Sequence, residues 1–335
     1  MIPELDLAQF EAGETRPAFL AELRAAAHDV GFFYVTGHGV EAQLQRALLE
    51  SAKRFFALPT GDKLAIEMLN SPHFRGYNRA ASELTRGRPD WREQIDIGAE
   101  RLPLPREPSS PEWMRLQGPN QWPAALPELR PIVTRWQAAA TDVLIRLLRA
   151  LALALGQAAD ALEPVYGLDP HYLVKLIRYP GRDATGDDQG VGAHKDAELI
   201  TLLLQDQAGL QVETAQGWVD VPPRPGTFVV NIGEQLELAT DGYLRATMHR
   251  VVTPPVASER ISAAFFLGAR LDATVQSLRL PPALAAKARG PARDPSNPLF
   301  REVGLNYLKG RLRSHPDVAR RHHADLILPT APSRA

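Results

Sequence analysis

The sequence predicts a mainly β fold with flanking helices, an α+β protein whose core is a sandwich or barrel. Three features indicate this fold. Helix-like and strand-like segments alternate in the first 156 residues, seven short β-like runs follow residue 170, and the tail after residue 292 is polar and basic. Closely spaced short strands favour a sandwich or barrel over βαβ units. We expect a single domain, 1–335, with an N-terminal region of helices and strands (1–156), a β core (171–280) and a C-terminal helical tail (292–335).

The elements of the N-terminal region follow from the spacing of apolar residues. Strands are expected at 2–7 and 31–40, and helices at 17–30, 41–59 and 126–156, the last as one long helix or a pair. Gly31 is expected to end the helix that precedes it. The section 60–122 is polar and rich in Pro, Gly and Arg, so loops are expected there.

The amino-acid composition excludes several classes of function and of metal site. Lys and Arg number 38, Asp and Glu 39, and the net charge is −1, so nothing indicates a nucleic-acid partner. Because the chain has no cysteine, a bound metal must be held by His, Asp or Glu. The acidic N-terminus does not resemble a signal peptide, and the apolar stretch 144–156 is too short to span a bilayer. We expect a cytoplasmic protein, a monomer or weak homodimer, with a small-molecule substrate and no membrane partner.

Three of the nine histidines are followed two residues later by aspartate, which is frequent enough by chance that context must choose among them. The pairs are His194–Asp196, His315–Asp317 and His323–Asp325. The two tail pairs lie in a charged segment that we expect to be a solvated helix, where residues i and i+2 point about 200° apart. The first pair lies at a predicted strand, where i and i+2 face the same side and converge.

A third ligand is supplied by His249, which lies in another β-like run, MHRVVTPP (248–255). We call His194, Asp196 and His249 the metal trio. Two imidazoles and one carboxylate leave half of an octahedral iron shell open, and tetrahedral zinc is a weaker alternative. Taken alone, His249 also fits a core histidine with satisfied hydrogen bonds.

A carboxylate-binding pair follows the trio. Arg260 and Ser262 share one face of a run that otherwise contains Ile, Ala and Phe. A guanidinium that faces a β core is unfavourable unless it meets an anion, and its planar fork suits a carboxylate. The alternative is an Arg that points outward from the rim.

At these residues the chain resembles the isopenicillin N synthase-like branch of the non-haem Fe(II), 2-oxoglutarate-dependent dioxygenases. The resemblance covers nearly the whole chain, because a set of segments occurs in the family's order. The segments are IPELDL (2–7), GFFYVTGHGV (31–40), GPNQWP (118–123), LIRYPG (176–181), His194–Asp196, NIGEQLELATDG (231–242), MHRV (248–251) and Arg260–Ser262. It implies a double-stranded β-helix, or jelly roll, with helices packed outside.

The resemblance also implies the chemistry. The metal trio would bind Fe(II), and 2-oxoglutarate would be the cosubstrate, its far carboxylate held by Arg260, Ser262 and Tyr179. O2 would be the oxidant and ascorbate the reductant in vitro. The implied reaction hydroxylates or desaturates a small molecule, such as an amino acid, peptide or secondary metabolite, and releases succinate and CO2.

Differences between this sequence and the family's motifs leave alternative activities open. Ile177-Arg178-Tyr179-Pro180-Gly181 replaces the Asn-Tyr-Tyr-Pro-x-Cys of plant enzymes, which points to the bacterial and fungal side. Isopenicillin N synthase uses its Arg-x-Ser for the substrate and needs no 2-oxoglutarate, so an oxidase of that type stays open. Its C-terminal glutamine has no counterpart, since the last Gln here is Gln276. A non-catalytic jelly-roll binding protein is a third hypothesis, and the intact trio argues against it.

Candidate substrate residues come from the polar stretch 73–98, which lines the pocket in relatives. They are Arg75, Tyr77, Glu83 and Asp96, although each alone fits a solvated loop. Phe265 and Phe266 alternate on a strand, so one is expected to face the pocket and the other the outer core.

A specific runner-up is an ethylene-forming and succinate-forming enzyme. SELTRGRPD (82–90) resembles a stretch of the bacterial ethylene-forming enzyme that contacts arginine, with Glu83 and Thr85 in the contacting places. Arg313 also has a counterpart in that enzyme. Lys175 and Tyr179 replace an arginine and a phenylalanine of that enzyme, and a tyrosine hydroxyl favours the ordinary succinate-forming geometry.

Overall fold

The computed structural model describes residues 1–168, 170–292, 294–295 and 297–327 and contains two β-sheets. The major sheet has eight strands in the order β1 (Glu4–Asp6), β2 (Phe32–Thr36), β12 (Phe228–Ile232), β9 (Ile200–Gln205), β14 (Arg260–Leu267), β7 (Tyr172–Tyr179), β6 (Glu93–Gly98) and β3 (Gly76–Asn78). The minor sheet has four, β11 (Gly217–Asp220), β10 (Leu210–Thr214), β13 (His249–Val252) and β8 (Gln189–His194). A separate short hairpin pairs β4 (Leu84–Thr85) with β5 (Arg88–Pro89).

The two sheets pack face to face around a small apolar core. This core takes Phe32 and Tyr34 from β2 and Val191 and Val212 from the minor sheet. Phe33 and Val35, which alternate with them on β2, belong instead to a larger core on the opposite face of the major sheet. Alternate side chains of GFFYVT therefore pack into two different cores, one on each face of the major sheet. The jelly roll expected from the sequence is confirmed.

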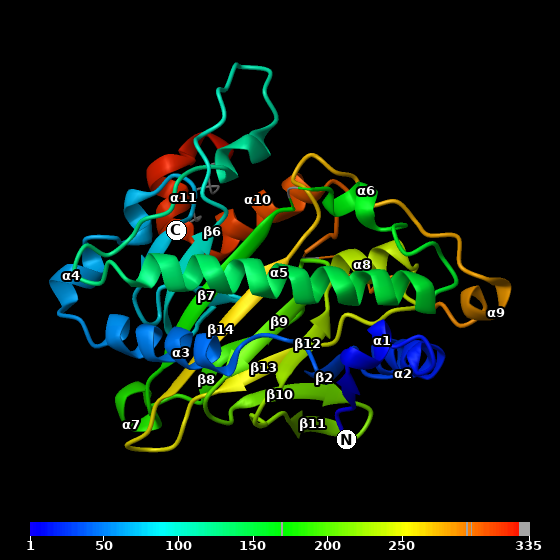
Figure 1. Ribbon diagram of the computed structural model, residues 1–335. Coiled ribbons are helices and arrows are strands. Elements are labelled where there is room, and N and C mark those ends of the chain that lie inside the picture. The colour runs from blue at the N-terminus through cyan, green and yellow to red at the C-terminus, as the bar shows by residue number, and fades with distance from the viewer. Residues whose placement is uncertain (169, 293, 296, 328–335) are drawn as a thin grey trace.

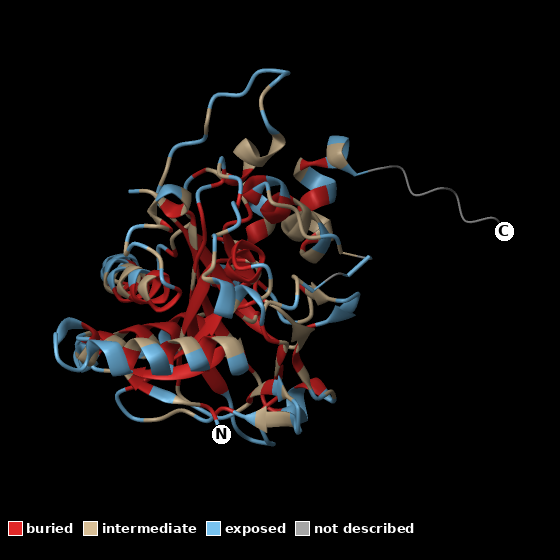
Figure 2. Ribbon diagram, turned by 90° about the vertical axis from the view of Figure 1, so that its right-hand side faces the viewer, coloured by how far each residue is buried: buried red, intermediate tan, exposed pale blue. Residues whose placement is uncertain are grey.

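Helices cover the outer face of the major sheet (Figure 1). The long ones are α2 (Arg16–Asp29), α3 (Ala42–Phe56) and α5 (Leu129–Ala154), and Figure 2 shows their outward faces exposed over a buried sheet. The segment 126–156 forms one helix rather than a pair, because Pro131 lies in its first turn, where a backbone N–H has no helical partner.

Shorter helices connect and close the structure. They are α1 (Ala8–Glu11), α4 (Thr60–Leu64), α6 (Glu163–Tyr166), α7 (Arg182–Thr185), α8 (Glu234–Ala239), α9 (Pro282–Ala285), α10 (Val303–Ser314) and α11 (Pro316–His322), with 3-10 turns at Met68–Asn70, Glu112–Leu116 and Ala324–Leu326. In the described part of the chain, no helix combines the length and apolarity needed to cross a membrane.

The section 60–122 was wrongly expected to be loops, because it contains β6, whose six residues are all buried. Its charged members are paired inside the protein. Glu93 accepts hydrogen bonds from Tyr77 at 2.5 Å, Lys63 at 2.9 Å and Arg178 at 2.7 Å. Burial raises the pKa of Glu93, and these hydrogen bonds lower it by more, so the carboxyl stays ionised.

Candidate active site

The metal trio is assembled by the pairing of β8 with β13. His194 ends β8 and lies directly across from His249 in the antiparallel ladder, with ring centroids 4.3 Å apart. Asp196 follows two residues after the strand end. Its Oδ1 lies 3.6 Å from His194 Nε2 and 3.5 Å from His249 Nε2. The candidate ligand atoms lie within 4.8 Å of one another, and this is the only such group of three in the described chain.

Backbone carbonyls orient both imidazoles. Nδ1 of His194 lies 2.8 Å from the Gly192 carbonyl oxygen, and Nδ1 of His249 lies 3.1 Å from that of Thr247. Each Nδ1–H therefore donates to the backbone, which leaves the Nε2 lone pair facing the shared space.

The other oxygen of Asp196 is also occupied. Asp196 Oδ2 accepts hydrogen bonds from Thr201 Oγ1 at 2.7 Å and Asn231 Nδ2 at 2.8 Å. One carboxylate oxygen is thus fixed and the other faces the two Nε2 atoms. Two imidazoles and one carboxylate, held in this way, fit the donor set of a non-haem iron(II) centre.

A buried guanidinium lies between β14 and β7. Arg260 is 1% exposed and donates to Gln205 Oε1 at 2.7 Å, to the Gln207 carbonyl at 3.1 Å and to Ser262 Oγ at 3.3 Å. Its Cζ lies 4.8 Å from the ring centroid of Tyr179. Arg260 forms no ion pair with any residue that the structure describes. Burial lowers its pKa, and an incoming carboxylate would supply the missing anion.

One cavity of about 820 Å³ opens beside the metal trio. Its wall contains His194 and Asp196 and residues that are distant in sequence, among them Glu83, Thr85, Lys175, Glu198, Glu234, Phe266, Tyr307 and Arg313. Helix α10 supplies Tyr307 and Arg313, while the β4–β5 hairpin supplies Thr85.

Two regions of the chain match known protein families. Residues 2–125 match the family described as "non-haem dioxygenase in morphine synthesis N-terminal", and residues 170–269 match the "2OG-Fe(II) oxygenase superfamily". The 2-oxoglutarate-dependent dioxygenase frbJ of Dothideomycetidae sp. is 37% identical over 95% of this chain and 90% of its own length. The chain belongs to the 2OG-Fe(II) oxygenase superfamily.

Other relatives agree with this membership. A homoarginine-6-hydroxylase of Arabidopsis thaliana is 35% identical over 77% of this chain and 78% of its own length. A 2OG-Fe(II) oxygenase family protein from Caulobacter crescentus has a solved structure with a TM-score of 0.74 and 29% identity, covering 93% of this chain and 99% of that one. The oxygenase is therefore an oxidoreductase that uses Fe(II), 2-oxoglutarate and O2 to oxidise a small molecule, releasing succinate and CO2.

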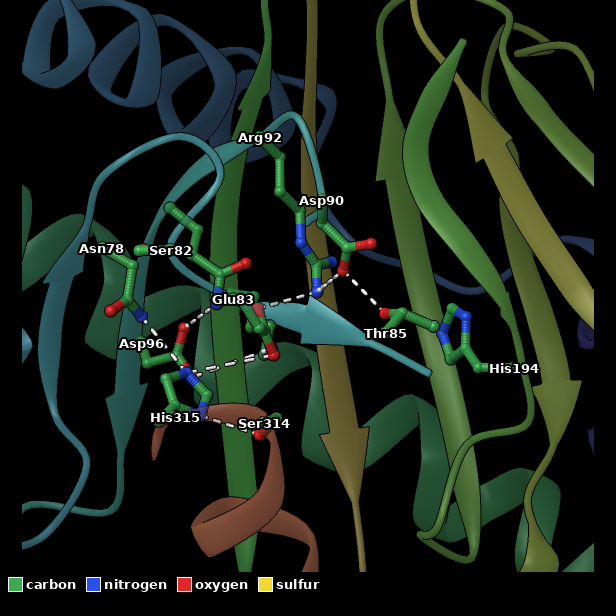
Figure 3. Close-up of polar contacts among 12 residues, drawn as sticks. Asn78, Ser82, Glu83, Thr85, Asp90, Arg92, Asp96, His194, Ser314 and His315 are labelled. Atoms are coloured by element: carbon green, nitrogen blue, oxygen red, sulfur yellow. Dashed lines mark hydrogen bonds and ion pairs between the residues drawn. The ribbon is translucent and has the colours of Figure 1, made fainter. Parts of the chain in front are cut away.

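Glu83 lies on the cavity wall of the oxygenase, but its carboxylate is already bound to two cations, of which Figure 3 labels Arg92. Arg92 Nη2 lies 2.7 Å from Oε2, and Lys175 Nζ lies 3.0 Å from Oε1. Burial raises the pKa of Glu83, whereas Arg92 and Lys175 hold it well below its usual range. Thr85 donates to Asp90 Oδ2 at 2.7 Å. Both arginine-contact candidates therefore have partners within the protein.

The other predicted substrate residues divide between the cavity and the core. Phe266 lines the cavity, and Phe265 is buried against Tyr172 in the core, as the alternation predicts. Asp96, Arg75 and Tyr77 are not among the described residues that line the cavity.

The solvated-loop interpretation of the 73–98 residues was wrong, because Arg75, Tyr77, Glu83 and Asp96 are all buried. Asp96 accepts from Arg311 at 2.8 Å, and Arg75 donates to backbone carbonyls, including that of His73 at 2.8 Å. Arg311 belongs to α10, so this helix contacts the stretch through the Arg311–Asp96 ion pair.

The tail was also wrongly expected to be solvated. His315 and His323 are each 1% exposed, and His323 Nε2 lies 2.8 Å from the Pro72 carbonyl oxygen. Figure 3 shows His315 beside Glu83 and Asp96. Asp325, the partner of His323 in its motif, instead forms an ion pair with Arg115. Neither tail pair belongs to a group of three potential metal ligands in the described residues.

Sequence reasoning did not find several cavity residues, among them the carboxyl groups of Glu198 and Glu234. Burial, followed by the charge of Asp196, raises the pKa of Glu198 to about 7. Burial likewise raises the pKa of Glu234 to about 7, although Lys195 opposes it. The only sequence signal was that Glu198 lies two residues after a metal-ligand candidate and therefore near the same site.

Proposed function

We propose that His194, Asp196 and His249 hold the catalytic iron and that Arg260, Ser262 and Tyr179 hold the far carboxylate of 2-oxoglutarate. The support is the convergence of the three ligand atoms and the buried guanidinium without an anionic partner. When bound, the iron and the cosubstrate supply the oxidant that removes hydrogen from the substrate. The protein's residues hold these groups in place and exclude water around them.

We further propose that the substrate is an amino acid with a cationic side chain, such as homoarginine, and that the reaction is hydroxylation. Acidic residues line the cavity beside the metal trio, and relatives named homoarginine-6-hydroxylase from Arabidopsis thaliana and Glycine max are 35% and 34% identical. The cavity wall is the observation that carries this proposal. The wall contains the carboxyl groups of Glu83, Glu198 and Glu234, with Arg86 and Arg313 at the exposed rim. Four further cations that line it are each bound to a carboxylate of the protein, namely Arg92, Lys175, Lys195 and Arg311.

The rim arginines are suited to the carboxylate end of such a substrate. Arg86 and Arg313 are exposed and line the cavity, and neither forms an ion pair within the described chain. A substrate carboxylate at the rim directs the side chain inward. The cationic group then lies deep in the cavity, near the metal trio.

Fragmentation of 2-oxoglutarate to ethylene is a second candidate, because Glu83, Thr85 and Arg313 line one cavity. Tyr179 argues against ethylene as the main product. Its ring lies under the Arg260 guanidinium, where its hydroxyl favours the ordinary orientation of the cosubstrate.

Turnover with Fe(II), 2-oxoglutarate, ascorbate and one amino acid at a time tests the substrate proposal. L-Homoarginine, L-arginine and L-lysine are compared with L-homocitrulline, a neutral analogue of homoarginine. We expect succinate and a product with one added oxygen atom, both dependent on a cationic amino acid. Succinate release that is the same with all four compounds and with none would contradict the proposal. Gas chromatography of the sealed vials would detect ethylene as a major product.

We also propose that the chain is a single folding unit, present in the cytoplasm as a monomer or weak homodimer. One apolar core contains Leu23 and Leu147 from the N-terminal helices, Leu202 from the β core and Val318 from the tail. A shared core favours one cooperative unfolding transition. Calorimetry and light scattering test the transition and the oligomeric state, and two separated transitions would contradict the single unit.

A further inference from the structure

The two carboxyl groups that the sequence did not reveal, Glu198 and Glu234, lie at the metal side of the cavity. The backbone N–H of Glu234 donates to the Asp196 carbonyl at 2.8 Å, and that of Gln235 donates to the Glu198 carbonyl at 3.1 Å. Gly233 permits this contact, because a Cβ there would lie 2.0 Å from the Glu198 carbonyl oxygen. The start of α8 is thus fixed against the metal-binding loop.

The charge environment of Glu198 differs from that of Glu83. Glu198 is 8% exposed and Glu83 is also 8% exposed, so both are largely removed from water. Glu83 is in contact with Arg92 and Lys175, whereas neither Glu198 nor Glu234 has an ion-pair partner among the described residues. The positive charge of Arg311 lowers the pKa of Glu198, but the Arg311 side chain binds another residue. Its Nη1 donates to Asp96 Oδ2 at 2.8 Å.

The cations near Glu234 are likewise engaged elsewhere. Lys195 binds Glu237 at 2.9 Å, and Lys309 donates to the Pro298 carbonyl. A cation that enters the cavity therefore meets two carboxyl groups that form no ion pair with any described residue. At the Glu83 end it meets a carboxylate with both oxygens occupied.

A third polar group points to a ligand at the same place. Tyr307 lines the cavity, is 6% exposed, and its hydroxyl lies beside the Glu198 carboxyl without a hydrogen bond of full geometry to any described residue. Burial and then the neighbouring Glu198 carboxyl hold the pKa of Tyr307 well above its usual range. The hydroxyl and the carboxyl are therefore neighbours on the cavity wall, and a cationic ligand that binds both would complete their hydrogen bonding.

We propose that Glu198, assisted by Glu234 and Tyr307, binds the cationic end of the substrate and sets the preference for a positively charged side chain. This inference rests on the proposed function and specifies which residues select the substrate. Glu198 lines the same cavity as His194 and Asp196, so a cation bound at Glu198 lies in the cavity that borders the metal trio. Glu83 then has a structural role, in which it neutralises Lys175 and Arg92.

The test measures binding rather than turnover. Calorimetric titration is performed without oxygen, on protein loaded with Fe(II) and 2-oxoglutarate, with L-homoarginine and then with L-homocitrulline. The two ligands have nearly the same shape and differ in charge, so the ratio of their dissociation constants reports charge recognition. Glu198→Gln should weaken homoarginine binding about ten- to a hundred-fold, since one charge-assisted contact is lost, and should leave homocitrulline nearly unchanged.

Glu83→Gln is the matched variant, because it makes the same change at an equally buried glutamate on the same cavity wall. It removes no proposed contact to the ligand but leaves Arg92 and Lys175 without their anion, so we expect it to reduce the charge preference by less than Glu198→Gln does. The opposite pattern, with the preference kept in Glu198→Gln and lost in Glu83→Gln, would overturn the inference. If the wild-type protein itself shows no preference for homoarginine, the proposed substrate class fails as well. Thermal unfolding verifies that each variant is folded, and Glu198→Asp and Glu83→Asp replace any that is not.

Discussion

Arg260→Gln should weaken 2-oxoglutarate binding without removing the iron. The Arg260 guanidinium is buried, its hydrogen bonds go to Gln205, Gln207 and Ser262, and it has no anionic partner among the described residues. A hydrogen bond to a charged group contributes roughly 1.5–3 kcal/mol. Its loss raises the dissociation constant of the cosubstrate by about ten- to a hundred-fold.

Ligand-dependent stability offers an assay that is independent of turnover. At a concentration one hundred times its dissociation constant, a ligand stabilises the folded state by about 2.7 kcal/mol. At that same concentration the variant should gain only about 0.4–1.4 kcal/mol from 2-oxoglutarate. Chemical unfolding with and without 2-oxoglutarate, in the presence of Fe(II), measures the difference.

Arg178→Gln is the control for this experiment. Arg178 lies one residue before Tyr179 on β7 and is ion-paired with Glu93 and Glu259, each at 2.7 Å. It should lower the stability of the protein but leave the gain from 2-oxoglutarate unchanged. An equal gain in wild type and Arg260→Gln would refute the assignment of Arg260 as the carboxylate-binding residue.

Three further predictions follow from the metal site, the core and the buried charges. Alanine at any member of the metal trio should abolish iron binding, and Asp325→Ala should not. Metal analysis of the purified proteins measures the bound iron. An iron-free Asp325→Ala variant would contradict the assignment of the ligands. Trp136→Ala removes a fully buried side chain whose ring centroid lies 5.3 Å from that of Phe228. It should lower the free energy of unfolding, measured in urea, by roughly 3–5 kcal/mol. The pKa of Glu93 is lowered in the folded state, so its contribution to stability is present above its unfolded pKa of about 4.3 and is lost as pH falls. The stability difference between wild type and Glu93→Gln should therefore shrink below about pH 4.3, and a difference that grows with acid would oppose the argument.

The metal trio could be predicted in part from strand geometry, because His194 and His249 lie on paired strands, whereas Asp196 lies two residues beyond the end of β8. His194 and Asp196 were separated from the two tail pairs by the periodicity of strands and helices, and the structure brings His194 and His249 together as cross-strand neighbours. The seven short β-like runs after residue 170 predicted a sandwich or barrel, and the family resemblance implied the jelly roll.

The buried charges could not be predicted from the sequence. Glu93 and Asp96 give β6 a polar composition, and their ion-pair partners Lys63, Arg178 and Arg311 lie far away in the chain. Burial of such a strand depends on tertiary pairing, which no local pattern records. The same reason applies to Glu198, which lines a cavity together with Glu234 of α8 and Tyr307 of α10.

Anaerobic titration of the protein with Fe(II), with and without 2-oxoglutarate, tests the central claim most directly. We predict a weak metal-to-ligand charge-transfer band in the visible that requires both components, reaches its maximum at one iron per chain and is absent from His194→Ala. Iron binding that gives no such band with 2-oxoglutarate, or a band of full strength in His194→Ala, would contradict the account.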